Sequence, residues 1–396
     1  MKDLKHLIYF EGLLENANNA LVRQAKAEGK LCIGYTCFHM PEVILNVDNC
    51  FSVRLRAPNT GSMDIATYYM SNYSCEFCRA ILERGIEGGY NFLDALAAQD
   101  ACAEMNRCAE HIEILNCVDN DKFFVTHADI PYKVVDYTVR HYVTQMRKRV
   151  LNPLSEVYGV DTSDAALRDA VRRHNELCGI ISEIGEYRKL DNPTITGYEY
   201  HILNLVSYVC PQYLVADKLR ETLEEIKGRK PDPKPWYRVR VGIVGSEIDD
   251  PELTKLIEDC GAMVVFDRYC FGSTPGREII PLNEQEDVLT QICRHYMEVS
   301  ECPRYISNEK VAQRRETADR LAKEFKADGI IYEQIKFCDY WAFERALASH
   351  VMAEEYDHPV LSIDRPYNVR GSGQLRTRVQ AFVESLEFKR IKGGSE

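Results

Sequence analysis

Cysteine is the residue type in this chain whose number and positions suggest a chemical role. There are 15 cysteines among 396 residues. The chain is long and acidic and begins with no segment typical of a secretion signal, so we expect reduced thiols rather than disulfides. Such thiols either fill a core as small hydrophobic groups or act as soft ligands for zinc or iron–sulfur clusters. The positions of the cysteines along the chain indicate which of them fill the core and which could bind a metal.

Four cysteines directly follow predicted β-strands. Each closes an apolar or β-type run: Cys37 after LCIGYT, Cys102 after FLDALAAQDA, Cys270 after AMVVFDRY and Cys338 after GIIYEQIKF. Ligands of open parallel α/β sheets bind outside the carboxyl ends of the strands. We therefore predict that these four thiols face one cleft. Five others have the scattered positions typical of core cysteines: Cys32, Cys50, Cys178, Cys210 and Cys260.

Cys75 and Cys78 form a CxxC motif at the start of a predicted helix. The helix dipole and the free N–H groups of the first turn favour thiolates at such a place. There is no second CxxC to complete a zinc site, and the spacing of Cys102, Cys108 and Cys117 matches no common zinc pattern. Ligand type and spacing leave an iron–sulfur cluster, a zinc ion or no metal open. Ligands spread over most of the chain favour a cluster between domains.

The length and the segment pattern predict an α/β protein with several domains. The first 132 residues read as an α/β domain carrying the cluster-binding cysteines, with an amphipathic helix over 1–30 and a helix from Glu76. Residues 133–228 are helical throughout, and the proline-rich segment 229–236 predicts a linker. Strands are expected at 31–36, 52–56, 92–98 and 122–127.

Residues 237–396 predict a Rossmann-like domain. A strand at 237–244, a helix at 251–259 and a strand at 262–267 form a βαβ unit. Further strands are expected at 328–338 and 358–364, with a last helix at 373–387. Alternating strands and helices indicate a parallel sheet.

Composition disfavours several classes of function. The formal net charge of -12 is unsuited to nucleic acid or anionic membranes, which require clustered Lys and Arg. No apolar run approaches the length of a membrane span, and we expect a cytoplasmic protein. There is no Walker A motif, no GxGxxG after a strand and no GxSxG elbow. ATP, dinucleotide and serine-hydrolase chemistry within this chain is therefore not expected.

Four segments together resemble the 2-hydroxyacyl-CoA dehydratase and benzoyl-CoA reductase family, which includes the double-cubane cluster proteins. They are YTCFHMPEVI (35–44), YSCEFCRAILERGIEGGYNFLDALAAQDACAEMNR (73–107), IKFCDY (335–340) and GQLRTRVQAFVESL (373–386). The resemblance spans nearly the whole chain and implies two Rossmann-like parallel-sheet domains with an intervening helical segment.

The resemblance also implies a cofactor and a reaction. By motif, a [4Fe–4S] cluster is bound by Cys75, Cys102 and Cys338, and one iron stays open for substrate. In the family, a separate ATP-dependent activator delivers the electron, and the enzymes work as dimers of similar subunits. The expected function is the iron–sulfur subunit of a dehydratase that eliminates water from (R)-2-hydroxyacyl-CoA by a ketyl-radical mechanism.

Extra cysteines set this chain apart from the dehydratases it resembles. Ala103 follows Cys102 where the family often has Asp, and Cys37, Cys78 and Cys270 are further candidate cofactor ligands. The TCFHMPE turn resembles the double-cubane branch, which binds an [8Fe–9S] cluster and reduces small molecules. The alternatives are such a reductase, an electron-relay subunit of a benzoyl-CoA reductase-like complex, or a homologue without a cluster.

A few residues besides cysteine are candidates. Glu42 begins a predicted helix just after Cys37, and is either a general base beside the cluster or a carboxylate that complements the helix dipole. His39 and His127 lie at strand ends and could reach the same cleft. An acyl-CoA substrate needs basic groups for its phosphates. Four arginines near strand ends are candidates, each otherwise an ordinary surface residue: Arg54, Arg56, Arg365 and Arg370.

Overall fold

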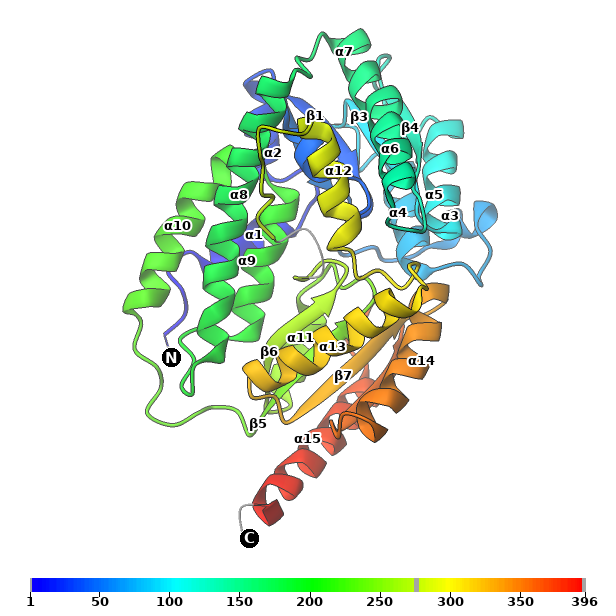
Figure 1. Ribbon diagram of the computed structural model, residues 1–396. Coiled ribbons are helices and arrows are strands. Elements are labelled where there is room, and N and C mark those ends of the chain that lie inside the picture. The colour runs from blue at the N-terminus through cyan, green and yellow to red at the C-terminus, as the bar shows by residue number, and fades with distance from the viewer. Residues whose placement is uncertain (1, 274–277, 394–396) are drawn as a thin grey trace.

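Two parallel sheets form the framework of the molecule. The computed structural model describes residues 2–273 and 278–393. Each sheet has four strands, in the order β2-β1-β3-β4 in the first and β6-β5-β7-β8 in the second. Figure 1 shows the two sheets in separate halves of the molecule, with a group of long helices beside them. The predicted fold class, two Rossmann-like parallel-sheet domains with an intervening helical segment, is confirmed.

The first sheet consists of β1 (Leu31–Tyr35), β2 (Cys50–Arg54), β3 (Ala95–Asp100) and β4 (Phe124–Asp129). β1 pairs with both β2 and β3, and β2 is buried along its whole length. Parallel strands covered on both faces carry such continuous apolar runs. The connecting helices are the 3₁₀ turn η1 (Glu42–Asn46), α3 (Asp64–Tyr69), α4 (Glu76–Ile86) and α5 (Ala103–Ile114).

The amino-terminal segment differs from the single helix predicted over 1–30. It forms α1 (Leu7–Leu14) and α2 (Ala20–Ala27). The Asn19 side chain accepts hydrogen bonds from the N–H groups of Leu21 and Val22, at 3.0 and 3.1 Å. Asparagine is among the best N-cap residues, so it starts a new helix here despite the continuous helical pattern.

The intervening segment between the two sheets is helical. It forms α6 (Asp136–Gln145), the π turn η2 (Met146–Leu151), α7 (Asn152–Tyr158), α8 (Asp164–Glu186), the 3₁₀ turn η3 (Tyr187–Lys189), α9 (Gly197–Val209) and α10 (Gln212–Gly228). Helix α9 is buried on almost every side, since it packs against β2, β6, α1 and α11. It therefore lies between the two sheet domains and contacts both.

The second sheet consists of β5 (Val239–Gly245), β6 (Ala262–Tyr269), β7 (Gly329–Ile335) and β8 (Val360–Arg365). Its helices are α11 (Glu252–Asp259), α12 (Val288–Glu298), α13 (Asn308–Glu324), α14 (Asp339–Glu354) and α15 (Gly373–Gly393). No helix in the described ranges is long and apolar enough to span a bilayer.

Helix α12 follows a strand of the second sheet but packs on the first domain. Leu289, Ile292 and Tyr296 belong to the core that also contains Ile33 and Val43 of the first domain. Figure 1 shows α12 beside α8 and β1 rather than over the second sheet. The segment after β6 thus returns to the first domain, which the predicted division at 237 did not anticipate.

Candidate metal centre

Seven cysteines line one cavity of about 310 Å³ between the two sheet domains. All six predicted cofactor ligands are among them, together with one cysteine that the sequence analysis did not single out. The seven are Cys37, Cys75, Cys78, Cys102, Cys270, Cys302 and Cys338. None of the 15 cysteines forms a disulfide, so all seven thiols are available as ligands.

The strand ends bring four of these thiols together. Cys37 lies two residues after β1, Cys102 two residues after β3, Cys270 directly after β6 and Cys338 three residues after β7. The carboxyl ends of both sheets therefore face the same cavity. This is the arrangement expected of ligand sites in parallel α/β proteins. Scattered core cysteines such as Cys178 do not line the cavity.

Three of the thiols sit at helix N-termini. Cys75 is the N-cap of α4, Cys102 of α5 and Cys338 of α14. The Cys102 sulfur accepts a hydrogen bond from the Met105 N–H at 3.4 Å. The positive end of the helix dipole and the free N–H groups of the first turn stabilise a thiolate at this position. The three residues implied as ligands by family resemblance thus share one position, the N-cap of a helix.

Cys75, Cys78, Cys102 and Cys338, here called the first thiol group, interact with one another. Hydrogen bonds with Cys102 and Cys75, together with burial, raise the pKa of Cys78 well above its usual value. The same hydrogen bond with Cys78 lowers the pKa of Cys102. Burial and the neighbouring Cys75 raise the pKa of Cys338. The hydrogen bond from the Cys78 thiol therefore favours the thiolate form of Cys102.

Cys37, Cys270 and Cys302, here called the second thiol group, also lie near one another. Burial raises the pKa of Cys37 to about 12 and that of Cys302 to about 11. Burial, Glu247 and the neighbouring Cys302 raise the pKa of Cys270 well above its usual value. These groups are neutral thiols without metal, and binding a metal would release their protons.

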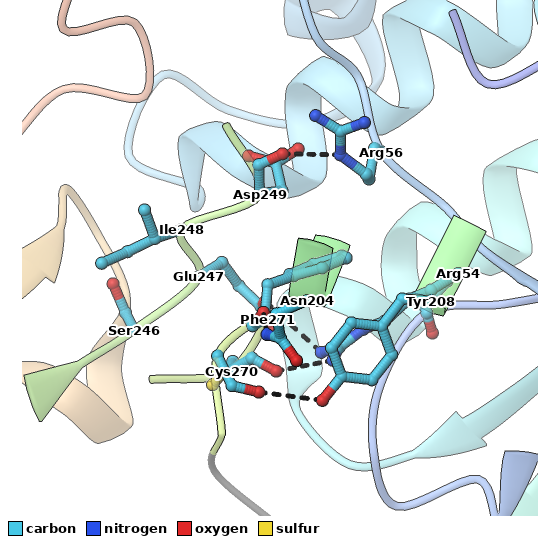
Figure 2. Close-up of polar contacts among 12 residues, drawn as sticks. Arg54, Arg56, Asn204, Tyr208, Ser246, Glu247, Ile248, Asp249, Cys270 and Phe271 are labelled. Atoms are coloured by element: carbon cyan, nitrogen blue, oxygen red, sulfur yellow. Dashed lines mark hydrogen bonds and ion pairs between the residues drawn. The ribbon is translucent and has the colours of Figure 1, made fainter. Parts of the chain in front are cut away.

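A buried arginine connects the second thiol group to the first sheet. Figure 2 shows Arg54, from the end of β2, among Glu247, Cys270 and Phe271. Its Nη1 donates to the Cys270 carbonyl oxygen at 2.5 Å, and Nη2 lies 3.4 Å from the Glu247 carboxylate. The guanidinium carbon lies 3.8 Å from the centre of the Phe271 ring. Burial raises the pKa of Glu247 to about 7.

Helix α9 also binds the loop that follows β6 and contains Cys270. Asn204 Nδ2 donates to the Phe271 carbonyl oxygen at 2.9 Å, and the Tyr208 hydroxyl donates to that of Gly272 at 2.9 Å. In Figure 2 these contacts surround the Cys270 backbone. Arg56 Nε adds a 2.5 Å hydrogen bond to the Asp249 carbonyl oxygen. The position of Cys270 is therefore set by the first domain and α9 as well as by β6.

The four arginines suggested as phosphate ligands do not line the cavity. Arg54, Arg56 and Arg365 are 1%, 2% and 3% exposed. Each already binds protein groups, and Arg365 pairs with Glu333 at 2.7 Å. Arg370 is exposed and lies within 4 Å of acidic side chains. The structure thus gives no support to their role in binding acyl-CoA.

Glu42 binds to residues that do not line the cavity. It is buried, bonds to His174 Nδ1 at 2.7 Å and accepts a hydrogen bond from Asn46 Nδ2 at 2.8 Å. It is not among the cavity-lining residues, and its role as a general base stays a prediction without geometric support.

His127 pairs with Glu113 on the surface at 3.0 Å. His39, in contrast, lines the cavity.

Glu247 and Cys302 line the cavity but were not predicted from the sequence. Glu247 follows β5 closely in the segment GIVGSE, so the strand-end rule that selected the cysteines could also have selected it. Cys302 lies in the loop between α12 and α13. It follows helix α12, which packs on the first domain, rather than the end of a strand.

The donor set has the ligand type that an iron–sulfur cluster requires. Among the described residues, no three Cys, His, Asp or Glu side chains form a group that could hold a single metal ion. Seven thiols line one cavity. In an iron–sulfur cluster the cysteines bind different iron atoms, so the ligands are spread around the cluster.

Comparisons with known proteins define the class. Residues 37–386 match the family model described as 2-hydroxyglutaryl-CoA dehydratase, D-component. The chain belongs to this family.

Its relatives bear the names of enzyme subunits. The (R)-phenyllactyl-CoA dehydratase beta subunit of Clostridium sporogenes is 23% identical, covering 95% of this chain and 97% of that one. One of the benzoyl-CoA reductase subunits of Thauera aromatica is 20% identical, covering 96% and 97%. The (R)-2-hydroxyglutaryl-CoA dehydratase subunit beta of Acidaminococcus fermentans is 19% identical, covering 92% and 95%.

Proposed function

We propose that this chain is an iron–sulfur enzyme that binds its cluster in the cysteine cavity and transfers electrons there to a bound substrate. One observation carries the proposal. The three cysteines matched by motif, Cys75, Cys102 and Cys338, line the same cavity as the second thiol group. Soft thiolates gathered from both domains around one enclosed volume are the ligands that such clusters use.

The number of thiols favours the double-cubane [8Fe–9S] cluster over a single [4Fe–4S] cluster. A cubane with one open iron occupies three cysteines, and Cys75, Cys102 and Cys338 suffice for it. The second thiol group would then have no ligand role, although Arg54 and α9 fix the backbone of one member. Cys75, Cys102 and Cys338 of the first thiol group would bind one cubane, and the three cysteines of the second thiol group would bind the other. Cys78 would remain as the hydrogen-bond donor to its neighbours.

Residues of the chain prepare the cavity for this chemistry. When bound, the cluster would supply electrons at low potential. Phe77, Met105 and Trp341 contribute apolar wall and exclude water. The buried Arg54 guanidinium places a fixed positive charge beside the Cys270 backbone and the Glu247 carboxyl, which would offset the negative charge of nearby thiolates.

The size of the cavity favours a small substrate. Pockets for drug-sized ligands measure roughly 300–1,000 Å³, and the 310 Å³ here must also accommodate the cluster. Little room would remain for an acyl-CoA chain. We therefore propose the reduction of a small molecule.

A dehydratase-type subunit is the second candidate. It is favoured by the family match and by relatives whose names are those of dehydratase subunits. In this case one cubane on Cys75, Cys102 and Cys338 would act on (R)-2-hydroxyacyl-CoA together with a second, similar subunit.

Both candidates share partners and location. Electrons would come from a separate ATP-dependent activator, since this sequence has no Walker A motif of its own. A similar subunit or a second copy would complete the enzyme. Reduced thiols suit the cytoplasm.

Iron and acid-labile sulfide per chain, measured on protein purified without oxygen, test the proposal. The iron of two cubanes supports the double-cubane enzyme, and that of one cubane supports the dehydratase subunit. Reduction assays with small molecules and elimination assays with 2-hydroxyacyl-CoA substrates then separate the activities. A chain that holds no iron after anaerobic reconstitution contradicts both.

A further inference from the structure

The cysteine cavity is lined by acidic side chains and by no strongly basic one. Among the described residues, its lining includes Glu104, Glu247 and Asp339 but no lysine or arginine. A cleft lined by one sign of charge attracts small ions of the opposite sign and repels ions of its own sign. The charge of the lining therefore bears on which substrates enter.

Glu104 and Asp339 are carboxylates that no cation neutralises. Each lies in the first turn of a helix that begins at a proposed ligand, Glu104 in α5 after Cys102 and Asp339 in α14 after Cys338. Glu104 is partly exposed and Asp339 is exposed, and neither side chain has a hydrogen bond or ion pair with another described residue. The helix dipole favours a carboxylate at either place, but it does not require that both line one cavity, one from each sheet domain.

The arginines nearest to the cavity are buried behind its wall. Arg54 and Arg304 are each 1% exposed, and neither lines the cavity. Arg54 pairs with Glu247 at 3.4 Å and balances the charge of that carboxylate. Arg304 donates to the carbonyl oxygens of Asp100 and Ile130, both at 3.0 Å. Neither guanidinium is placed to bind an anion inside the cavity.

We infer that the small substrate of this cavity is uncharged or positively charged, and that Glu104 and Asp339 keep small anions out. The inference rests on the proposed function, because it concerns the same cavity. A cluster bound by thiolates would add negative charge there rather than offset that of the carboxylates. Tyr340 and Trp341 also line the cavity, and aromatic rings attract cations as carboxylates do.

Charged thiol reagents measure this selection on apo protein. Two methanethiosulfonates are compared, one carrying a trimethylammonium group and the other a sulfonate. Both react by one step, in which the thiolate attacks the reagent's divalent sulfur, a disulfide forms and methanesulfinate leaves. The five cysteines that are partly exposed all line the cavity, and the other ten are buried. The reagents therefore report on the cavity.

The quantity compared is the rate with the cationic reagent divided by the rate with the anionic one. Both reagents attack the same thiolates, so a change in the pKa of a thiol cancels in this ratio. The same ratio for 2-mercaptoethanol, a small neutral thiol, gives the intrinsic preference of the reagents. We expect a higher ratio in the wild-type protein, and we expect salt to lower it because salt screens the carboxylates.

Glu104→Gln combined with Asp339→Asn removes both charges and keeps the size of the side chains. The ratio should fall by about fivefold, allowing for screening by salt. Asp164→Asn is the matched control, because Asp164 is an exposed residue in the first turn of α8 and does not line the cavity. It should keep the wild-type ratio.

Two results of the thiol experiment overturn the inference. One is a wild-type ratio no higher than that of 2-mercaptoethanol. The other is an equal ratio in the wild type and in a folded double variant. Should the double variant fail to fold, the wild-type ratio and its salt dependence decide alone.

The iron-loaded enzyme provides a second test. Nitroxides with an ammonium, hydroxyl or carboxylate substituent on the same ring carry the same reducible group. The reduced cluster loses one electron to the nitroxide, which takes a proton from water and becomes a hydroxylamine. The rates, followed by loss of the nitroxide paramagnetic signal, should fall from ammonium to hydroxyl to carboxylate, and less steeply in the double variant. A carboxylate reduced as fast as the ammonium overturns the inference. Protein that binds no iron refutes the proposed function instead, and the thiol ratios still test the charge of the cavity.

Discussion

Arg54, at the end of the first sheet, donates a 2.5 Å hydrogen bond to the backbone carbonyl of Cys270 in the second domain. The Arg54 side chain is buried, and its guanidinium also packs on Phe271 at 3.8 Å. A buried cation thus fixes the backbone of one thiol to a strand of the other domain. The relative placement of the two thiol groups depends on this contact.

Replacing Arg54 by Met should therefore weaken both the fold and the site. Methionine keeps the unbranched stem but removes the charge and the donors to Cys270 and Glu247. Losing hydrogen bonds from a buried charged group costs about 2–4 kcal/mol. We expect the free energy of unfolding of the apo protein, measured with denaturant, to fall by that amount. We also expect less iron per chain after reconstitution.

An exposed arginine provides the control for this change. Arg172 lies on the outer face of α8 and pairs with Asp169 at 2.8 Å. Exposed pairs of this kind contribute about 0–1 kcal/mol, so Arg172→Met should keep nearly wild-type stability and iron. Equal losses in both variants would mean that Arg54 has no special role between the domains.

Cys302 distinguishes the two cluster types. If the second thiol group binds a cubane, Cys302→Ala should retain about half of the wild-type iron. Cys293→Ala is the matched control, since Cys293 is buried on α12 but does not line the cavity. Iron and sulfide analysis with the absorbance spectrum gives the result. Wild-type content in Cys302→Ala would remove this residue from the ligand set.

Local rules were enough to predict that several thiols lie at one cavity. Cys37, Cys102, Cys270 and Cys338 were selected because each follows a strand, and a parallel sheet places all such positions at one edge. The strands themselves were recognisable since buried parallel strands carry continuous apolar runs. The predicted bounds differ from the observed ones by only a few residues.

Long-range packing limited the rest of the prediction. Cys302 reaches the cavity only because α12 packs on the first domain, and helical periodicity does not reveal which surface a helix covers. Glu42 was correctly placed at a helical turn, but its side chain bonds to His174 on α8. That partner is 132 residues away along the chain, and no local pattern indicates it.

His201 should make stability depend on pH. It lies on α9 and bonds through Nδ1 to Thr254 Oγ1 at 2.9 Å and through Nε2 to the Ile248 carbonyl at 3.2 Å. Burial lowers its pKa to about 4, against about 6.5 in an unfolded chain. The unfolded state therefore binds the extra proton below pH 6.5, and the folded state loses about 3 kcal/mol between pH 6.5 and pH 4.

The measurement for His201 is a comparison of apo proteins. Free energies of unfolding at pH 7, 5.5 and 4 should fall more steeply in the wild type than in His201→Gln, because glutamine does not titrate in this range. His127→Gln, which changes an exposed histidine, should follow the wild type. Parallel pH profiles for wild type and His201→Gln would refute the assignment.

Gly245, the last residue of β5, tests how tightly the strand end before Glu247 is packed. A Cβ atom there would lie closer than 3.0 Å to the Glu333 backbone oxygen on β7, and backbone cannot move aside as a flexible side chain can. Overpacking of this kind costs about 1–3 kcal/mol. Gly245→Ala should therefore lower the unfolding free energy by that amount.

Gly179 is the matched control for Gly245→Ala. It lies inside α8, and a Cβ added there meets nothing within 4 Å. Alanine is favoured over glycine by about 0.5–1 kcal/mol in a helix interior, so Gly179→Ala should stabilise the protein. Replacing glycine by alanine is thus expected to lower the free energy of unfolding at position 245 and to raise it at position 179. Denaturant unfolding of both apo variants measures these changes. If Gly245→Ala proves neutral, β5 and β7 are free to separate, and the position of Glu247 is not fixed by the sheet.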